Sequence, residues 1–467
     1  MSELRLCTAL GAHMILQRET NVRLWGKGKR EGDVVYAVFG PYETYGIVNN
    51  KLEWEAFLPP MPANTVPETL VISDGEDRVA YDDILVGDVW VINGQSNAEY
   101  CLDNCNYNRP DIYAEDIDSL TTEDNIRIVL QRRGHATMDP NKMLTPQFDL
   151  PCPEQSSWRD VATAENRGTA SALAFFFARK VSRALKGRVP IGIVQVASSG
   201  SPMMELIMPE LVSPLGYTKP EKEDIPLAGI YNALMAPIQK MTIKGMLFYQ
   251  GESEQRAPHA YAYQLKWYVE ELRKRFEIDF PFYQVQLASH NDMEVNKLWT
   301  RLFPVRCAQN NLMDILDNSY TVTAIDIGSR VGDKDMAHPP YKQPVGERLA
   351  TAVLANEYGV GDPEFSLSPR PCHWRFDEDK ITVHFDFVGD GLVVLKGEKL
   401  TGFEAMTQDG KYKKVRARIV DEETVEFRGV KNAKALRYAC VPDATWEHAN
   451  LGSSTELPTL AFEIFDK

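Results

Sequence analysis

The segment DVWVINGQSNAEYC, residues 88–101, places a serine shortly after an apolar run. The run predicts a buried strand, which ends on the small and turn-prone residues Gly94, Gln95, Ser96 and Asn97. A serine hydroxyl is a weak nucleophile near neutral pH and needs a general base before it can attack a carbonyl. Ser96 is therefore a candidate nucleophile for acyl transfer, provided that another segment supplies the base.

The best candidate for this base is His338, one of eight histidines. Asp335 precedes it by three residues in DMAH, and a carboxylate at this spacing can hold the Nδ1–H of the imidazole while Nε2 faces Ser96. Asp333 and Asp326 are alternative carboxylates for the same role. DxxH is a common tetrapeptide, and an ordinary histidine of a surface loop would fit it as well.

Acyl transfer also requires hydrogen-bond donors directed at the developing oxyanion. Three candidates are the backbone N–H of Ser96, the N–H of Gly200, where the backbone can approach closely, and the side-chain amide of Gln250. Taken alone, Gly200 could equally be an ordinary glycine of a turn. Gln250 could equally be an amide at the end of a strand whose hydrogen bonds are already satisfied. Three further polar side chains could bind substrate or support these donors: Gln95, Asn97 and Glu252.

A scaffold for these residues is predicted between about residues 86 and 360. Short apolar runs such as VWVIN, IGIVQVAS and KGMLFYQ alternate there with helical stretches, a pattern that predicts an α/β domain with a doubly wound parallel sheet. The helical stretches cover residues 170–187, 260–276 and 343–359. Ligands bind outside the carboxyl ends of the strands in such sheets, and the candidate residues follow strand candidates.

Both flanks of this region read as short strands. Residues 1–85 contain runs rich in β-branched and aromatic residues, separated by Gly, Pro and Asn turns, which predict an N-terminal β-sandwich. Residues 361–467 return to the same pattern and predict a C-terminal β domain. We therefore expect three domains, with boundaries near residues 85 and 360.

Charge and composition exclude some partners. The net charge is −15, from 51 basic and 66 acidic side chains, and no run rich in Lys or Arg appears. Nucleic acid and anionic membranes are therefore not expected as partners. Seven cysteines without a CxxC pair fit reduced thiols, and no signal peptide or long apolar segment is visible. We expect a cytoplasmic location, or a secreted or periplasmic one if a signal peptide has been removed. The chain could also form a homo-oligomer.

The segment GDVWVINGQSNAEY resembles the first block of the sialate O-acetylesterase-like carbohydrate acetylesterases, a family of SGNH hydrolases. VPIGIVQVASSGSP, MLFYQGESE and HPPYKQPVGERLA resemble later blocks of the same family in the same order, and the terminal regions match as well. The resemblance covers nearly the whole chain. The GxSxG elbow of the α/β-hydrolases is absent. Several positions beside the expected sugar pocket depart from the usual pattern. Ala98 replaces the usual Met, the usual Trp of the second block is missing, a serine replaces one glycine, and Met203 and Met204 stand where an acidic residue is expected.

The resemblance implies an SGNH-hydrolase fold, a flavodoxin-like doubly wound parallel sheet flanked by N- and C-terminal β-sandwich regions. It implies Ser96 as the nucleophile, His338 as the base and Asp335 as the orienting acid, with Ser96, Gly200 and Gln250 forming the oxyanion hole. The implied reaction is hydrolysis of an acetyl ester on a saccharide through an acetyl-serine, without metal or organic cofactor. Sialic acid is the first expectation for the sugar; acetylated xylan or mannan oligosaccharides and a non-catalytic glycan-binding role are the alternatives.

Overall fold

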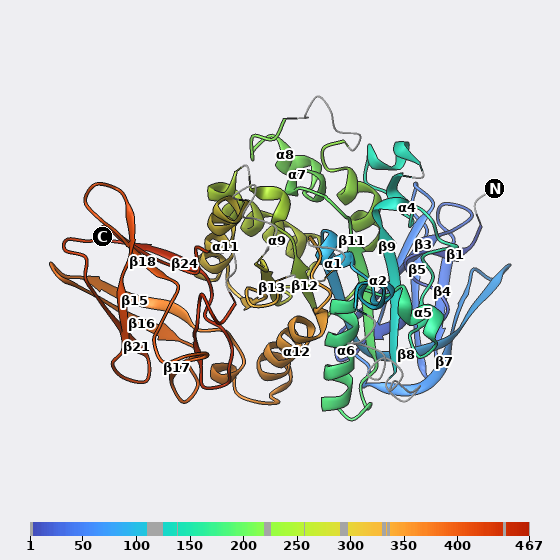
Figure 1. Ribbon diagram of the computed structural model, residues 1–467. Coiled ribbons are helices and arrows are strands. Elements are labelled where there is room, and N and C mark those ends of the chain that lie inside the picture. Colours follow the sequence, from blue (N-terminus) through green and yellow to red (C-terminus); the bar gives the residue numbers. More distant parts are fainter. Residues whose placement is uncertain are drawn as a thin grey trace. The chain divides into compact units, whose positions relative to one another are not determined.

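The computed structural model describes residues 3–109, 125–137, 139–218, 226–255, 257–289, 298–328, 333, 337–441 and 445–466. These residues form a mixed α/β structure with several sheets (Figure 1). Two compact units make up the chain. The first comprises Met1–Asp103, Asp111–Phe248 and Trp267–Phe282, and the second comprises Asn104–Pro110, Tyr249–Lys266 and Tyr283–Lys467.

The N-terminal part of the first unit consists of strands, as its sequence predicts. They are β1 (Arg5–Leu6), β2 (Ile15–Gln17), β3 (Val22–Lys27), β4 (Val34–Phe39), β5 (Tyr42–Ile47), β6 (Glu53–Leu58), β7 (Asn64–Ser73) and β8 (Arg78–Gly94). β1, β3 and β6 form one antiparallel sheet, and β4 pairs with both β5 and β7. In β4 the side chains of Val35, Ala37 and Phe39 are buried while their neighbours face outward, which is the alternation of a half-buried strand.

Strand β8 is 17 residues long and has two kinds of partner. Its first part pairs with β7 in antiparallel register and with β2 in parallel register. Its last part, Asp88–Gly94, pairs in parallel with β11 (Ile191–Ala197). The expected domain boundary near residue 85 falls inside this continuous strand, and the three-domain division stays a prediction.

The parallel sheet predicted for the middle of the chain contains β8, β11 and β9 (Ile126–Arg132) as adjacent parallel strands. β10 (Arg159–Asp160) pairs antiparallel with the outer side of β9, and β12 (Gly245–Tyr249) neighbours β8. Every residue of β11 and β12 is buried, as expected of strands that are covered on both faces.

Helices of the first unit follow its strands. They are α1 (Ser96–Glu99), α4 (Arg133–Thr137), α5 (Ala164–Gly168), α6 (Ala172–Ala184), α7 (Met203–Leu206) and α8 (Pro209–Val212), and α2 (Leu102–Asn108) and α9 (Tyr261–Phe276) have residues in both units. α6 is capped by Ser171, whose hydroxyl accepts a hydrogen bond from the Ala174 N–H, so the helix expected at 170–187 is confirmed with shorter ends. Its Phe177 packs edge-on against Trp90 of β8.

In the second unit, which contains all of β13 (Phe282–Gln286) except its first residue, β13 neighbours β14 (Ser319–Thr323). The long helices of this unit are α11 (Leu298–Ile315) and α12 (Lys342–Tyr358). α12 ends at Gly359, which has φ = 63° and lets the chain turn out of the helix; the helix expected at 343–359 is confirmed. No helix in the described ranges is long and apolar enough to cross a membrane.

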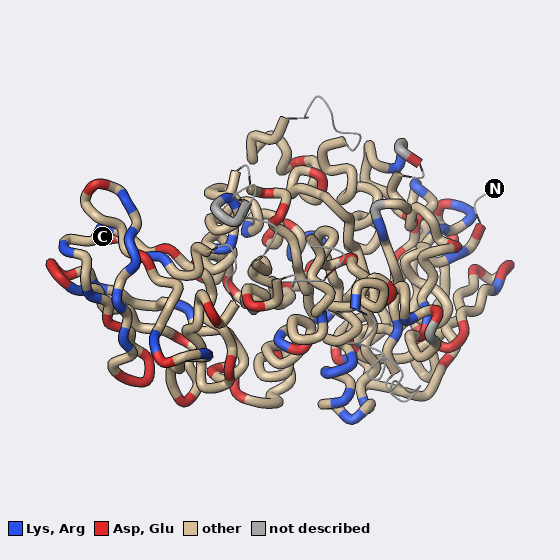
Figure 2. Tube along the Cα trace, in the orientation of Figure 1, with Lys and Arg blue, Asp and Glu red and all other residues tan. Residues whose placement is uncertain are grey.

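The C-terminal residues form small, mainly antiparallel sheets. Their strands are β15 (Arg370–Phe376), β16 (Lys380–Asp386), β17 (Leu392–Val394), β18 (Phe403–Met406), β19 (Tyr412–Lys414), β20 (Arg416–Ile419), β21 (Thr424–Arg428), β22 (Ala435–Tyr438), β23 (Leu451–Ser453) and β24 (Phe462–Phe465). Phe385, Phe403, Phe427 and Phe462 belong to one apolar cluster that these sheets share. Figure 2 shows acidic and basic residues interspersed along these strands.

Candidate functional site

The candidate nucleophile lies in the tight turn between β8 and α1. Gly94 has φ = 142°, a backbone conformation that residues with a Cβ rarely adopt, and Gln95 caps the short helix that begins at Ser96. The Ala98 N–H donates to the Gln95 carbonyl at 2.9 Å, and the Tyr100 N–H donates to the Ser96 carbonyl at 2.8 Å. Gln95 and Asn97 are buried, whereas Ser96 between them is partly exposed. The turn therefore presents one hydroxyl at the carboxyl end of a buried strand.

The loop that carries Gly200 adjoins this turn. Ala197, the last residue of β11, is aligned with Gly94, and the Ser198 N–H donates to the Gly94 carbonyl at 3.0 Å. Glu99 of α1 accepts hydrogen bonds at Oε2 from the backbone N–H of Ser199 at 2.8 Å and from its hydroxyl at 2.5 Å. These bonds join the helix that begins at Ser96 to the residue before Gly200.

Gly200 has φ = 76°, and no described heavy atom outside its chain neighbours lies within 4 Å of the point that a Cβ would occupy. The conformation, rather than a shortage of space, therefore requires glycine here. The residue is exposed. Together, Gln95, Ser96, Asn97 and Gly200 lie at the carboxyl ends of two adjacent parallel strands, which is the edge where the sequence predicts them.

A buried hydrogen-bonded chain supports the same loop. The hydroxyls of Ser198 and Ser201 are 2.6 Å apart, and the Ser201 hydroxyl donates to the Glu205 carboxylate at 2.9 Å. Sequence reasoning missed both Glu99 and Glu205, and it considered only Met203 and Met204 at the position where an acid is usual. The four-residue spacing from Ser201 to Glu205 across the start of α7 is the signal that could have found the second acid.

In the second unit, Gln250 directly follows β12 and is fully buried. Its Nε2 donates to Glu254 at 3.1 Å, and its Oε1 accepts from the Tyr261 hydroxyl at 2.7 Å. Its carbonyl accepts from the same hydroxyl at 2.9 Å and from Gln309 Nε2 at 3.0 Å. These partners on both ends of the amide define which end is the donor.

The segment that follows Gln250 is equally constrained. Gly251 has φ = 142°, a conformation that strains any residue with a Cβ, and a Cβ there would lie 3.0 Å from a Val305 methyl group of α11, which would have to shift. Glu252, the acid expected to support the oxyanion donors, is partly buried in a short 3-10 turn that ends at Glu254. Glu254 and Tyr261, which the sequence did not single out, both contact the Gln250 amide.

His338 is partly buried, in the segment that precedes α12. Asp335, the acid predicted to orient it, lies outside the described residues. Asp326, one alternative, forms a two-bond ion pair with Arg348 of α12, with both distances at 2.7 Å. Asp333, the other alternative, has a fully buried side chain that accepts from the Tyr341 hydroxyl at 3.3 Å and lies 3.5 Å from Arg109 Nη1.

The candidate residues thus fall into two groups. Ser96 and Gly200 belong to the first compact unit, whereas Gln250 and His338 belong to the second. The pairing of Ser96 with His338 stays a prediction.

Comparison with known proteins gives one consistent result. The model of a family described as "Carbohydrate esterase, sialic acid-specific acetylesterase" matches residues 86–355. The sialate O-acetylesterase of Homo sapiens is 24% identical over 394 residues, which cover 76% of this chain and 71% of that protein. The sialate O-acetylesterase of Rattus norvegicus is 24% identical over 420 residues, which cover 76% and 74% of the two chains.

One solved structure matches over almost the whole length of both chains. It is a carbohydrate acetylesterase from Xanthomonas citri, with a TM-score of 0.81 and 25% sequence identity. The match covers 98% of this chain and 99% of that one. The similarity in fold therefore includes the strands on both sides of residues 86–355.

Proposed function

Because the chain belongs to the carbohydrate esterase family of sialic acid-specific acetylesterases, we propose that it removes acetyl groups from sugars through a covalent acetyl-serine at Ser96. Membership of this family makes it a carboxylic ester hydrolase. The observation that carries the serine mechanism is the turn after β8, which buries Gln95 and Asn97 and leaves Ser96 partly exposed between them.

In the proposed reaction, the Ser96 Oγ attacks the acetyl carbonyl carbon while His338 Nε2 accepts the hydroxyl proton. Asp335 holds the Nδ1–H of the imidazole and stabilises its charged form. The carbonyl oxygen becomes an oxyanion, which accepts hydrogen bonds from the N–H groups of Ser96 and Gly200 and from the Gln250 amide.

The tetrahedral intermediate collapses when the sugar oxygen leaves with the proton that His338 carries. A water molecule then gives a proton to His338 and attacks the acetyl-serine, and acetate is released as Ser96 regains its proton. Every step uses only groups of the protein, substrate and water.

Fixed hydrogen-bond partners around the proposed oxyanion donors support this role. Glu99 and the Ser198–Ser201–Glu205 chain hold the loop of Gly200, and Tyr261 and Glu254 hold the Gln250 amide. Donors that are already oriented before the reaction stabilise developing charge without a cost of reorganisation. Gln95, Asn97 and Glu252 stay candidates for contacts to the sugar or for support of these donors.

We propose an acetylated sialic acid as the substrate, since two of the similar proteins are sialate O-acetylesterases. The Xanthomonas citri relative is described only as a carbohydrate acetylesterase, so acetylated xylo- and manno-oligosaccharides are the alternative. The proposal also includes the SGNH layout for residues 86–360 with flanking β-sandwiches, and a cytoplasmic location.

The test is acetate release from a panel of acetylated sialic acids, xylo-oligosaccharides and manno-oligosaccharides, with Ser96→Ala as the matched control. We expect turnover of acetylated sialic acid by the native chain, covalent labelling of Ser96 by a fluorophosphonate, and loss of both in Ser96→Ala at an unchanged melting temperature. Comparable acetate release by Ser96→Ala would end the serine mechanism. Absence of both labelling and turnover in the native chain would favour a glycan-binding protein instead.

A further inference from the structure

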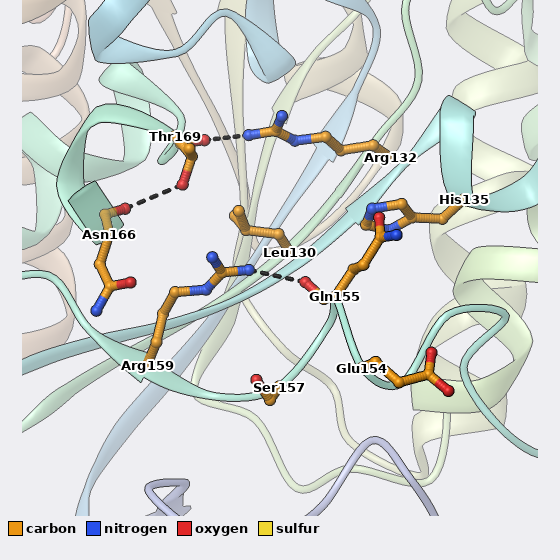
Figure 3. Close-up of a pocket in the computed structure, with 9 residues that line it drawn as sticks. All are labelled: Leu130, Arg132, His135, Glu154, Gln155, Ser157, Arg159, Asn166 and Thr169. Atoms are coloured by element: carbon orange, nitrogen blue, oxygen red, sulfur yellow. Dashed lines mark hydrogen bonds between the residues drawn. The ribbon is translucent and has the colours of Figure 1, made fainter.

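A cavity of about 350 Å³ lies wholly within the first compact unit (Figure 3). Its lining includes Arg132 at the end of β9, Arg159 of β10, and His135 of α4, gathered around the buried side chain of Leu130. None of these residues belongs to the proposed catalytic set. Two guanidinium groups and an imidazole in one cavity make a cluster of groups that can bind an anion.

The two arginines use few of their donors on the protein. Arg132 Nη2 donates to the Thr169 carbonyl, and Arg159 Nη2 donates to the Gln155 carbonyl at 2.8 Å. The Nε atoms of both are buried without a hydrogen-bond partner among the described residues. A guanidinium carries five N–H donors, so most of the hydrogen-bonding capacity of this pair is not used by the part of the protein that the structure describes.

The positive charge of this cavity is also poorly balanced. Within the described ranges, neither Arg132 nor Arg159 forms an ion pair with a carboxylate, and the Glu154 side chain on the rim is exposed to solvent. Burial and the neighbouring Arg132 lower the pKa of the Arg159 guanidinium, and the Glu165 carboxylate offsets part of this effect. Burial and both arginines lower the pKa of His135. A bound anion would offset this repulsion, in a chain whose net charge is −15.

One residue of the cavity, Arg132, lies on the same edge of the parallel sheet as Ser96, whereas Arg159 is aligned with Ile128 further back along β9. Arg132 is aligned with Ala197, and Ala197 is aligned with Gly94, two residues before Ser96. Since β11 alone separates β9 from β8, the Cα atoms of Arg132 and Gly94 are two strand spacings apart, or about 10 Å. A nine-carbon acidic sugar has a comparable length between its carboxylate at one end and its hydroxylated tail, where acetyl esters form, at the other.

We propose that Arg132 and Arg159 bind the carboxylate of an acidic sugar whose acetyl ester is cleaved at Ser96. This inference rests on the proposed function and names the part of the substrate that selects acidic over neutral sugars. The planar guanidinium suits a carboxylate because two N–H groups can meet its two oxygens in parallel. Neutral xylo- and manno-oligosaccharides have no carboxylate that the two arginines could bind.

The test compares an acetylated sialic acid with its methyl ester, which keeps the acetyl group and loses the negative charge. For the native chain, we expect kcat/KM to be about 10–100-fold higher for the acid, the factor that corresponds to a hydrogen bond to a charged group. In Arg159→Gln this ratio should fall to near one, and Arg159→Lys should restore part of it. Because the ratio is taken within one preparation, it does not depend on how much of a variant has folded.

Arg188→Gln is the matched control. Arg188 is exposed and precedes β11, at the opposite end of that strand from the cavity, so its replacement should leave the ratio unchanged. A ratio near one in the native chain, or equal ratios in the native chain and Arg159→Gln, would overturn the carboxylate site while leaving the esterase proposal intact.

A binding measurement separates this inference from the proposed function, because it needs no hydrolysis. N-acetylneuraminic acid without an O-acetyl group should raise the melting temperature of the native chain, and its methyl ester should not. Arg159→Gln should lose this shift. If inorganic phosphate or the methyl ester gives the same shift as the acid in both proteins, the cavity does not recognise the carboxylate of a sugar.

Discussion

Glu99 accepts two hydrogen bonds from Ser199, one from the backbone N–H at 2.8 Å and one from the hydroxyl at 2.5 Å. Glu99 ends the helix that begins at Ser96, and Ser199 precedes Gly200, so one carboxylate fixes the proposed nucleophile relative to a proposed oxyanion donor. We predict that Glu99→Ala lowers kcat on an acetyl ester by about 10–100-fold, because small displacements of catalytic groups are costly.

The control for this prediction is Glu31→Ala, which removes an exposed carboxylate from a turn of the N-terminal strands. Steady-state kinetics on p-nitrophenyl acetate should show no change for the control. Ser199→Ala should have an effect smaller than that of Glu99→Ala, because the backbone bond remains. Equal kcat values for Glu99→Ala and Glu31→Ala would show that the carboxylate does not position the loop.

The Gln250 amide offers a second prediction. Gln250→Ala should lower kcat by about 100–1,000-fold, the loss expected when one oxyanion donor is removed. Tyr261→Phe deletes the hydroxyl that holds Gln250 Oε1 at 2.7 Å, and it should lower both kcat and the free energy of unfolding, the latter by about 1 kcal/mol.

Tyr263→Phe is the matched control for Tyr261→Phe, because Tyr263 lies on the same helix and is 58% exposed. Urea denaturation and kcat are measured on both variants. If Gln250→Ala changes kcat by less than threefold, Gln250 is not an oxyanion donor.

Replacing the candidate acids one at a time distinguishes their roles. Asp335→Asn should lower kcat by about 10,000-fold with little loss of stability, as expected when the acid that orients a catalytic histidine is neutralised. Asp333→Asn should mainly lower the melting temperature, because its buried carboxylate contacts Arg109 and Tyr341. Kinetics and thermal denaturation on both variants provide the comparison; the opposite pattern would make Asp333 the triad acid.

His135 predicts a dependence of stability on pH. Its pKa in the folded chain is lowered by burial and by Arg132 and Arg159, so the unfolded chain binds the proton more tightly. The free energy of unfolding should therefore fall as pH decreases below the unfolded value of about 6.5. Native chain and His135→Gln are compared by urea denaturation at neutral pH and at mildly acidic pH. The native chain should lose more stability than the variant, and equal losses would contradict the prediction.

Much of the fold is predictable from local sequence patterns. The apolar run at 89–92 and the mainly apolar run at 191–197 indicate buried parallel strands, and Gly359 marks the end of α12. The turn of Ser96 is equally visible, since small polar residues stop an apolar run. These features depend on residues that are close together along the chain, where the relation between sequence and conformation is direct.

The supporting contacts are not predictable in the same way. Glu99 meets Ser199 across 100 residues, and Tyr261 meets Gln250 only because a helix returns beside the end of a strand. Arg132 and Arg159 converge through the antiparallel pairing of β9 with a strand of two residues, for which the sequence has no periodic signal. Such contacts follow from tertiary packing, which composition and spacing leave undetermined.

Strand β8 runs without a break from its pairing with β2 and β7 to its pairing with β11. Val86 is aligned with Leu16 of β2 and Asn64 of β7, and Asp88, two residues later, is aligned with Ile191 of β11. A truncated gene product starting at residue 86 would lack the chain that covers the beginning of this strand and would leave its backbone N–H and C=O groups unpaired. The N-terminal strands are thus an integral part of the enzyme's architecture, and trimming the protein to a catalytic fragment at this point should lower its stability.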